Sequence, residues 1–304
     1  FSASGAPGLQ LVALPEGMSV TDGVAYYSLK SGIQYAEPDY YRTSAIIPDD
    51  PDLWRQWGLV NTGQVYKEDF APGTPGADIQ AASAWNTTTN SDVIIAVLDS
   101  GVDYLHEDLA DNIWTNPLTG THGYDAITGT LEPMDLASHG THCAGIIGAV
   151  GNNGKGGSGV NWNATILPVR FLNSFGTGTV SDEIEAILWA ARNGAQIFSC
   201  SYGGSSFSQA EYEVIAGTEG LFICAAGNSG QDNDFEPHYP SSYDLDNIIS
   251  VAATNADDEL ASFSNFGKVS VDIGAPGADI YSTKHNIYKP DPVWRDSFET
   301  LNNW

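Results

Sequence analysis

Short, uninterrupted runs of β-branched and aliphatic residues recur along the chain and constrain its fold more than any other feature. Val93–Leu98 is such a run, and its lack of polar alternation is typical of a parallel strand buried on both faces. Five further runs follow, at Ile166–Leu172, Ile197–Cys200, Leu221–Ala225, Ile248–Ala252 and Val269–Ile273. Because helical segments separate several of them, the pattern predicts an α/β protein with a doubly wound parallel sheet.

One of the intervening helices is readable in detail. Ser181 is a suitable N-cap, Asp182 and Glu183 follow in the first turn, and Gly194 can end the helix. Its apolar residues recur at helical spacing, at Ile184, Ile187, Leu188 and Ala191. We therefore expect this face to pack against the sheet.

Polar residues and glycines directly follow several of the apolar runs. Asp99 follows the first run, the segment SYGG (201–204) follows the third, and Gly227 and Asn228 come shortly after the fourth. In doubly wound sheets, ligands bind outside the carboxyl ends of the strands. The sequence therefore predicts a site at this edge.

Three of these segments carry groups that manage charge and protons. Asp99 ends a buried strand, where a partly desolvated carboxylate gains from a cationic or N–H partner. His139 opens the segment HGTHCAGIIG (139–148), which is typical of a helix with small residues that lies close to a sheet. The Asn228 amide is the kind of donor that stabilises a developing oxyanion. An acid, a base and an oxyanion donor are therefore all available.

Charge and composition exclude other classes of protein. Lys and Arg total 11 against 38 Asp and Glu in 304 residues, a net charge of −27, which repels nucleic acid and anionic lipid. The apolar runs are far shorter than the roughly 18 residues of a membrane helix. We therefore expect no nucleic acid and no membrane partner. Three cysteines imply no disulfide framework.

Other readings of single residues stay open. His139 and His142 have the i, i+3 spacing of a zinc site, but no third ligand accompanies them. Cys143 either packs as a small apolar residue or makes the site sensitive to thiol reagents. A further acidic group is either a weak cation site or an exposed loop, at Asp232, Asp234 and Glu236.

Three motifs, in order, match one family: the Asp motif around Asp99, His-Gly-Thr-His-x-Ala-Gly from His139, and Ala-Ala-Gly-Asn ending at Asn228. Over about residues 57–284 the chain resembles the subtilisin-like serine endopeptidases, or subtilases (peptidase family S8). The resemblance implies that Asp99 orients His139, that His139 is the general base and then acid, and that Asn228 binds the tetrahedral intermediate. It also implies protein or peptide substrates, extended along Gly176, Thr177, Gly178, Ser201, Tyr202, Gly203 and Gly204.

The resemblance also divides the chain. Residues 1–41, with expected strands at Leu9–Leu14 and Ile33–Ala36, resemble the C-terminal part of an inhibitory propeptide, which would be a partner of the enzyme and be removed on maturation. Residues 42–56 are expected to be a linker, 57–284 an incomplete peptidase domain, and 285–304 a divergent tail that opens a C-terminal module. Family membership implies secretion, although no signal peptide precedes Phe1.

A structural calcium ion is implied as well. Carboxylate, amide and backbone oxygens suit this hard cation. The resemblance places the side-chain ligands at Asp50, Asp108 and Asn152, and carbonyl ligands at Val150, Gly154 and Gly156.

The family nucleophile is not found. Its motif, Gly-Thr-Ser-Met-Ala, does not occur in these 304 residues. Ser297 comes at about the expected place, but its neighbours Asp296 and Phe298 are not the small residues that let a substrate approach. Two functions remain: a serine endopeptidase whose serine segment is missing here, so that this chain is inactive, or a non-catalytic peptide-binding protein on the same scaffold.

Overall fold

The computed structural model describes residues 8–39, 46–68, 70–285 and 298–301, and the chain divides into two compact units, 1–44 and 45–304. In the first unit, α1 (Val20–Ser28) begins at Ser19, whose hydroxyl accepts a hydrogen bond from the Asp22 amide. Residues 8–39 contain no strand. The strands predicted at 9–14 and 33–36 are therefore wrong; most of those residues are exposed, and two short strands without an apolar partner are not stable.

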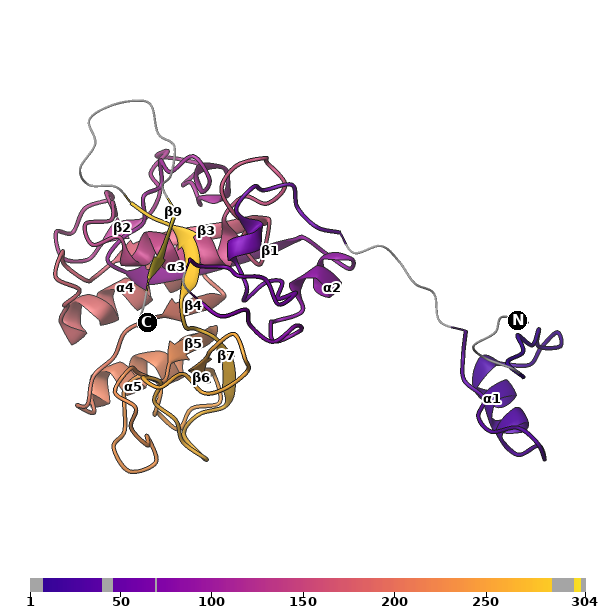
Figure 1. Ribbon diagram of the computed structural model, residues 1–304. Coiled ribbons are helices and arrows are strands. Elements are labelled where there is room, and N and C mark those ends of the chain that lie inside the picture. The colour runs from indigo at the N-terminus through magenta and orange to yellow at the C-terminus, as the bar shows by residue number, and fades with distance from the viewer. Residues whose placement is uncertain (1–7, 40–45, 69, 286–297, 302–304) are drawn as a thin grey trace. The chain divides into compact units, whose positions relative to one another are not determined.

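The second unit is built on a seven-stranded sheet with the order β2-β3-β1-β4-β5-β6-β7 (Figure 1). Every neighbouring pair in it is parallel. The strands are β1 (Asn90–Asp99), β2 (Tyr124–Asp125), β3 (Asn163–Arg170), β4 (Ile197–Cys200), β5 (Leu221–Ala225), β6 (Ile248–Thr254) and β7 (Ile273–Pro276). The predicted α/β fold with a parallel sheet is confirmed.

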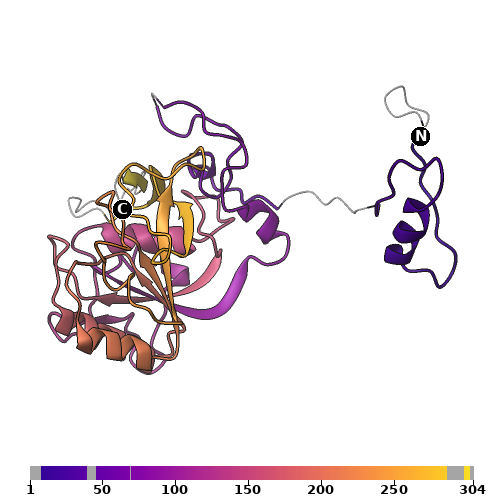
Figure 2. The same ribbon diagram turned by 90° about the horizontal axis from the view of Figure 1, so that it is seen from below.

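Helices cover both faces of this sheet (Figures 1 and 2). The side chain of Val97 packs with α3 (His139–Gly148), whereas its neighbours Ala96 and Leu98 pack with α4 (Val180–Arg192) and α5 (Gln209–Gly217). Because successive side chains of a strand point to opposite faces, α3 lies on one side and α4 and α5 on the other. The sheet is therefore doubly wound, as predicted.

Among the element boundaries that differ from those predicted, two have a clear physical cause. Helix α4 begins at Thr179, whose hydroxyl accepts a hydrogen bond from the Asp182 amide, and not at Ser181. Strand β7 begins at Ile273 because the preceding amides of 268–270 donate to the Asp234 carboxylate instead of to a neighbouring strand. The Asp234 carboxylate therefore keeps residues 268–270 in a loop and delays the start of β7.

Residues 46–56 fold with the second unit, which begins before the predicted start at residue 57. Asp50 and Leu53 are buried, and the second unit also contains the short helices η1 (Leu53–Arg55), α2 (Ala81–Trp85) and η2 (Ala110–Asn112). Only 42–45 of the predicted linker lie outside these described residues.

A two-stranded antiparallel sheet joins β8 (Ile280–Thr283) to β9 (Phe298–Leu301). The hydroxyls of Ser282 and Thr283 donate to the carbonyls of α3, at 2.9 and 2.7 Å. Part of the predicted tail therefore forms a strand, whereas Ser297 lies outside the described residues. Within the described part of the chain, no helix is both long and apolar enough to cross a membrane.

Candidate active site

The carboxyl ends of β3, β1, β4 and β5 meet at one edge of the sheet, because these neighbouring strands are parallel. Asp99 ends β1 there. The loop 173–178 follows β3, and the segment 201–204 follows β4. The ring of Tyr202 packs edge-on against Phe171, with ring centroids 4.6 Å apart. One of the two segments predicted to bind substrate therefore packs against the residue that leads from β3 into the loop of the other.

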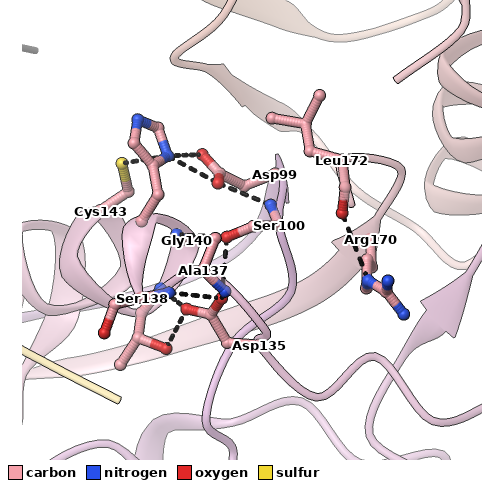
Figure 3. Close-up of polar contacts among 11 residues, drawn as sticks. Asp99, Ser100, Asp135, Ala137, Ser138, Gly140, Cys143, Arg170 and Leu172 are labelled. Carbon is pink, nitrogen blue, oxygen red and sulfur yellow. Dashed lines mark hydrogen bonds and ion pairs between the residues drawn. The ribbon is translucent and has the colours of Figure 1, made fainter. Parts of the chain in front are cut away.

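Asp99 and His139 are in direct contact (Figure 3). Nδ1 of His139 lies 2.6 and 2.7 Å from the two carboxylate oxygens, and the Asp99 side chain is 1% exposed, whereas that of His139 is 29% exposed. Burial has the largest single effect and lowers the pKa of His139, but the charge and hydrogen bond of Asp99, together with Cys143, outweigh it, so the pKa lies above its usual value. Because both contacts to Asp99 are made by Nδ1, the second ring nitrogen, Nε2, is not the one that Asp99 binds, as a base for a substrate-side proton requires.

Glycine at position 140 permits this contact. A Cβ atom there would lie 2.0 Å from the Gly101 carbonyl oxygen and 2.9 Å from the Asp99 Cβ. Any side chain would therefore push the start of α3 away from the end of β1. The small residue of the motif sets the distance between the acid and the base.

Cys143 lies one helical turn after His139, and its Sγ is 4.0 Å from Nδ1. Ligand atoms of Asp99, His139 and Cys143 lie within 4.8 Å of one another, and the described ranges hold no other such group of three His, Cys, Asp or Glu side chains. His142 is not part of it, since its Nε2 lies 3.2 Å from the Ile280 carbonyl oxygen. Burial lowers the pKa of His142 to about 3, so this imidazole is neutral.

Asn228 follows β5 on the same edge and is exposed. No hydrogen bond of its side chain occurs within the described residues. Sequence reasoning missed Asn265, which shapes this loop. Its side-chain Oδ1 accepts the backbone amides of Ser229 and Gln231 at 2.7 and 3.3 Å, and its backbone amide donates to the Gly227 carbonyl. No sequence signal distinguishes Asn265, because an Asn between loop residues is common.

The predicted substrate-binding segments differ in how their backbones are used. Gly176, Thr177 and Gly178 lie in an exposed loop. Gly204 exchanges two hydrogen bonds with Tyr239, of 2.9 and 2.7 Å. Described backbone groups do not pair with residues 201–203 in this way, so Gly204 differs from its three predecessors in having its backbone already paired.

Two buried glutamates lie next to Tyr202. Glu183 of α4 and Glu211 of α5 are 5% and 3% exposed, and Oε1 of Glu183 has no hydrogen-bond partner. Burial, then the charge of Glu211, raise the pKa of Glu183 to about 9. Glu211 accepts a hydrogen bond from the Tyr243 hydroxyl at 2.8 Å. The pair therefore carries a proton at neutral pH.

The residues predicted to bind calcium come together around two buried carboxylates. Asp50 accepts the amides of Asn152 and Asn153 at 2.7 and 3.1 Å. Asp108 is 0% exposed and accepts from the Asn153 side chain at 2.7 Å, while its Oδ2 has no partner. Burial, and to a lesser degree the charge of Asp50, raise the pKa of Asp108 to about 7.

The remaining predicted calcium ligands belong to the loop 150–156, whose polar groups are partly used. The Asn152 side chain accepts the Asp49 amide at 3.3 Å, and the Gly156 carbonyl accepts the Asp52 amide at 2.7 Å. Val150 donates its amide to the Asp108 carbonyl, and Gly154 has the positive φ of a tight turn. Asn153 bridges both carboxylates and was not predicted.

Comparison with known proteins agrees with this geometry. The subtilase family model matches residues 90–297. A thermophilic serine proteinase of Bacillus sp. (strain AK1) is 38% identical over 83% of this chain and 56% of its own length. Thermitase of Thermoactinomyces vulgaris is 39% identical over 67% of this chain and 70% of its own length. The chain thus spans a little over half of the first relative's length and about 70% of the second's.

A solved protease structure from Pseudoalteromonas arctica PAMC 21717 has a TM-score of 0.67 and 27% identity, with 85% of this chain and 82% of that chain covered. Three observations lead to the same family: the parallel sheet, the Asp99–His139 contact and the extent of the family match. The chain belongs to the subtilase family of serine peptidases.

Proposed function

We propose that these residues form the acid–base part of a serine endopeptidase. The contact between Asp99 and His139, 2.6 Å at the carboxyl edge of the sheet, carries the proposal. A serine hydroxyl that attacks a peptide carbonyl carbon gives its proton to Nε2 of His139, and the same nitrogen then gives it to the leaving amine. Asp99 keeps Nδ1 as the donor and stabilises the imidazolium.

Asn228 is proposed to stabilise the negative oxygen of the tetrahedral intermediate. Its side chain is exposed at the same edge, on a loop held by a buried asparagine. A fixed amide donor aimed at the developing charge lowers the barrier because it needs no reorganisation during the reaction. Its exposure and the fixed loop support this role.

The serine is the missing component of the triad. Because the family motif does not occur in these 304 residues, we expect this chain on its own to bind extended peptides at the site without hydrolysing them. Peptide binding without turnover is also what the alternative, non-catalytic function requires.

The test combines a fluorogenic peptide assay with a serine-directed phosphonate. We expect no turnover and no phosphonate label, but a shift of the His139 NMR signal when a non-hydrolysed peptide is added; the N228A variant should need more peptide for the same shift. Turnover that H139A abolishes, with label on Ser297, would disprove the inactivity. Absence of any peptide effect on His139 would disprove the proposed function.

A structural calcium ion fits the second site. The unpartnered, buried Oδ2 of Asp108 and the nearby Asp50 present the oxygen ligands that calcium prefers. Asp50 and Asp108 would hold the ion, with oxygens of the loop 150–156. A bound cation would neutralise the two buried carboxylates and fasten the segment around Asp50 to this loop.

Residues 1–41 are proposed to be the end of a propeptide. The separate unit 1–44 supports a removable segment. We also propose secretion, on the basis of family membership. N-terminal sequencing of the protein from its native host tests both: an N-terminus between about residues 40 and 50 in the culture medium is expected, and an intact Phe1 in cell extracts only would contradict them.

A further inference from the structure

Asp135 lies between the two segments that carry the acid and the base. It is 0% exposed, and its carboxylate accepts five hydrogen bonds, all from neutral donors. Oδ1 accepts the Ser100 hydroxyl and the amides of Ala137 and Ser138, at 2.8, 2.8 and 2.9 Å. Oδ2 accepts the amide and the hydroxyl of Thr141, at 2.9 and 2.5 Å. Both oxygens are therefore fully used.

On the β1 side, Asp135 acts through Ser100 (Figure 3). The Ser100 hydroxyl donates to Asp135 and accepts the Gly140 amide at 3.1 Å. The Ser100 amide donates to Oδ1 of Asp99 at 2.6 Å. Ser100 is completely buried. One residue therefore joins three groups: its backbone amide binds the carboxylate of Asp99, and its hydroxyl binds Asp135 and the residue after His139.

On the α3 side, Asp135 replaces the missing helix cap. Ser138 is the N-cap of α3, but its side chain makes no capping bond, and its φ of 74° is left-handed. Its hydroxyl instead donates to the His285 carbonyl. A non-glycine residue keeps such a conformation only where its surroundings fix it. Asp135 does so by accepting the Ser138 amide, and its negative charge at the helix start is favourable.

We propose that Asp135 is a positioning residue, which holds the end of β1 and the start of α3 in the one arrangement where His139 contacts Asp99. This role rests on the proposed function, in which that contact orients the base. Asp135 does not touch the imidazole. It acts through Ser100 on the acid, and through Ser138 and Gly140, the two neighbours of His139.

A merely structural carboxylate would stabilise the fold without affecting His139. The distinguishing quantity is therefore the titration of His139 itself, since its raised pKa depends on contact with Asp99. The full chain labelled with ¹⁵N-histidine gives six imidazoles, and the H139Q variant assigns the signal. This measurement needs no substrate, so it is independent of whether the protein hydrolyses peptides.

Three variants separate the explanations. D135N removes the negative charge and replaces one of the two acceptor oxygens by an NH₂ group, which cannot accept a hydrogen bond. S100A keeps the Asp135 charge and the backbone amide that donates to Asp99, but removes the hydroxyl that connects Asp135 with Gly140. D234N is the matched control, because Asp234 also accepts three amides and a hydroxyl but is exposed and bonds to the loop 268–270.

We expect the pKa of His139 to fall by about one unit or more in D135N, and to fall in S100A as well, with D234N equal to the wild type. If D135N alone lowers it, the effect is a through-space charge and the proposal is wrong. If neither changes it, while the melting temperature drops, Asp135 is only structural. Should D135N fail to fold, S100A decides between these outcomes.

Discussion

Replacement of Glu183 by Gln should change how the stability of the protein depends on pH. Glu183 is 5% exposed, next to Glu211, and its pKa is raised from 4.5 to about 9. The groups that face it are Glu211, Tyr202 and Cys200, none of which is a cation. Between pH 4.5 and 9 the folded protein keeps a proton that the unfolded chain releases.

The sign and size of the effect follow from this difference. Because the unfolded state binds fewer protons over this range, stability is lost as the pH rises, by about 1.4 kcal/mol per pH unit for one proton. From pH 6 to pH 8 the loss from this group is about 2.7 kcal/mol. Gln has the same shape and no proton to lose. The difference between the free energies of unfolding of E183Q and wild type should therefore shift in favour of E183Q by about 2.7 kcal/mol between pH 6 and pH 8.

Urea unfolding at pH 6, 7 and 8 measures the difference. The control is E213Q, which makes the same charge change on the exposed side of α5 and should stay within about 0.5 kcal/mol of the wild type throughout. If the curves of E183Q and wild type run parallel from pH 6 to 8, Glu183 is ionised in the folded protein, and the reasoning from burial is refuted.

Three further changes test the rest of the site. In D99N, the pKa of His139 should fall to near its ordinary value of about 6.5, as followed by NMR; an unchanged titration would mean that Asp99 does not set it. Calcium at 100 times its Kd should stabilise the chain by about 2.7 kcal/mol in thermal unfolding, an effect that D108N loses and D234N keeps. Equal stabilisation of all three proteins would place calcium elsewhere. Methyl methanethiosulfonate should modify Cys143, 7% exposed, before Cys200 or Cys224, at 1% and 0%, and shift the His139 signal; C143A should resist this, and a shift in C143A would exclude the thiol as its source.

Much of the fold was predictable because burial leaves a direct record in the sequence. A strand buried on both faces, such as β1, can hold few polar residues. The first polar residue after its apolar run, Asp99, therefore marks the end of the strand at the edge of the sheet. Parallel strands then bring their carboxyl ends together without further information. The contact of Asp99 with His139, which opens a helix and not a strand, was instead implied by the resemblance to the subtilases, whose motifs occur here in the same order.

The unpredicted features depend on partners that are distant in sequence. The buried face of α4 contains Glu183, Ala186, Ile187 and Ala190, one residue away from the predicted face at 184, 187, 188 and 191. Glu183 reads as a solvated first-turn acid, and only the packing of α5 against α4 makes it buried. Asp135 likewise has no signal of its own, because its role depends on Ser100, 35 positions earlier.

The composition explains how this site is held together. With 11 Lys and Arg against 38 Asp and Glu, most carboxylates cannot have a cationic partner. Asp50, Asp135 and Asp234 instead accept two or more backbone amides each. Such donors are fixed by the chain itself and bring no mobile side chain to order, so their geometry is set when the loop folds. Where those amides are absent, as at Glu183, the carboxyl keeps its proton instead. In this acidic chain, backbone amides therefore take the place of cations as the partners of several carboxylates, Asp135 beside the active site among them.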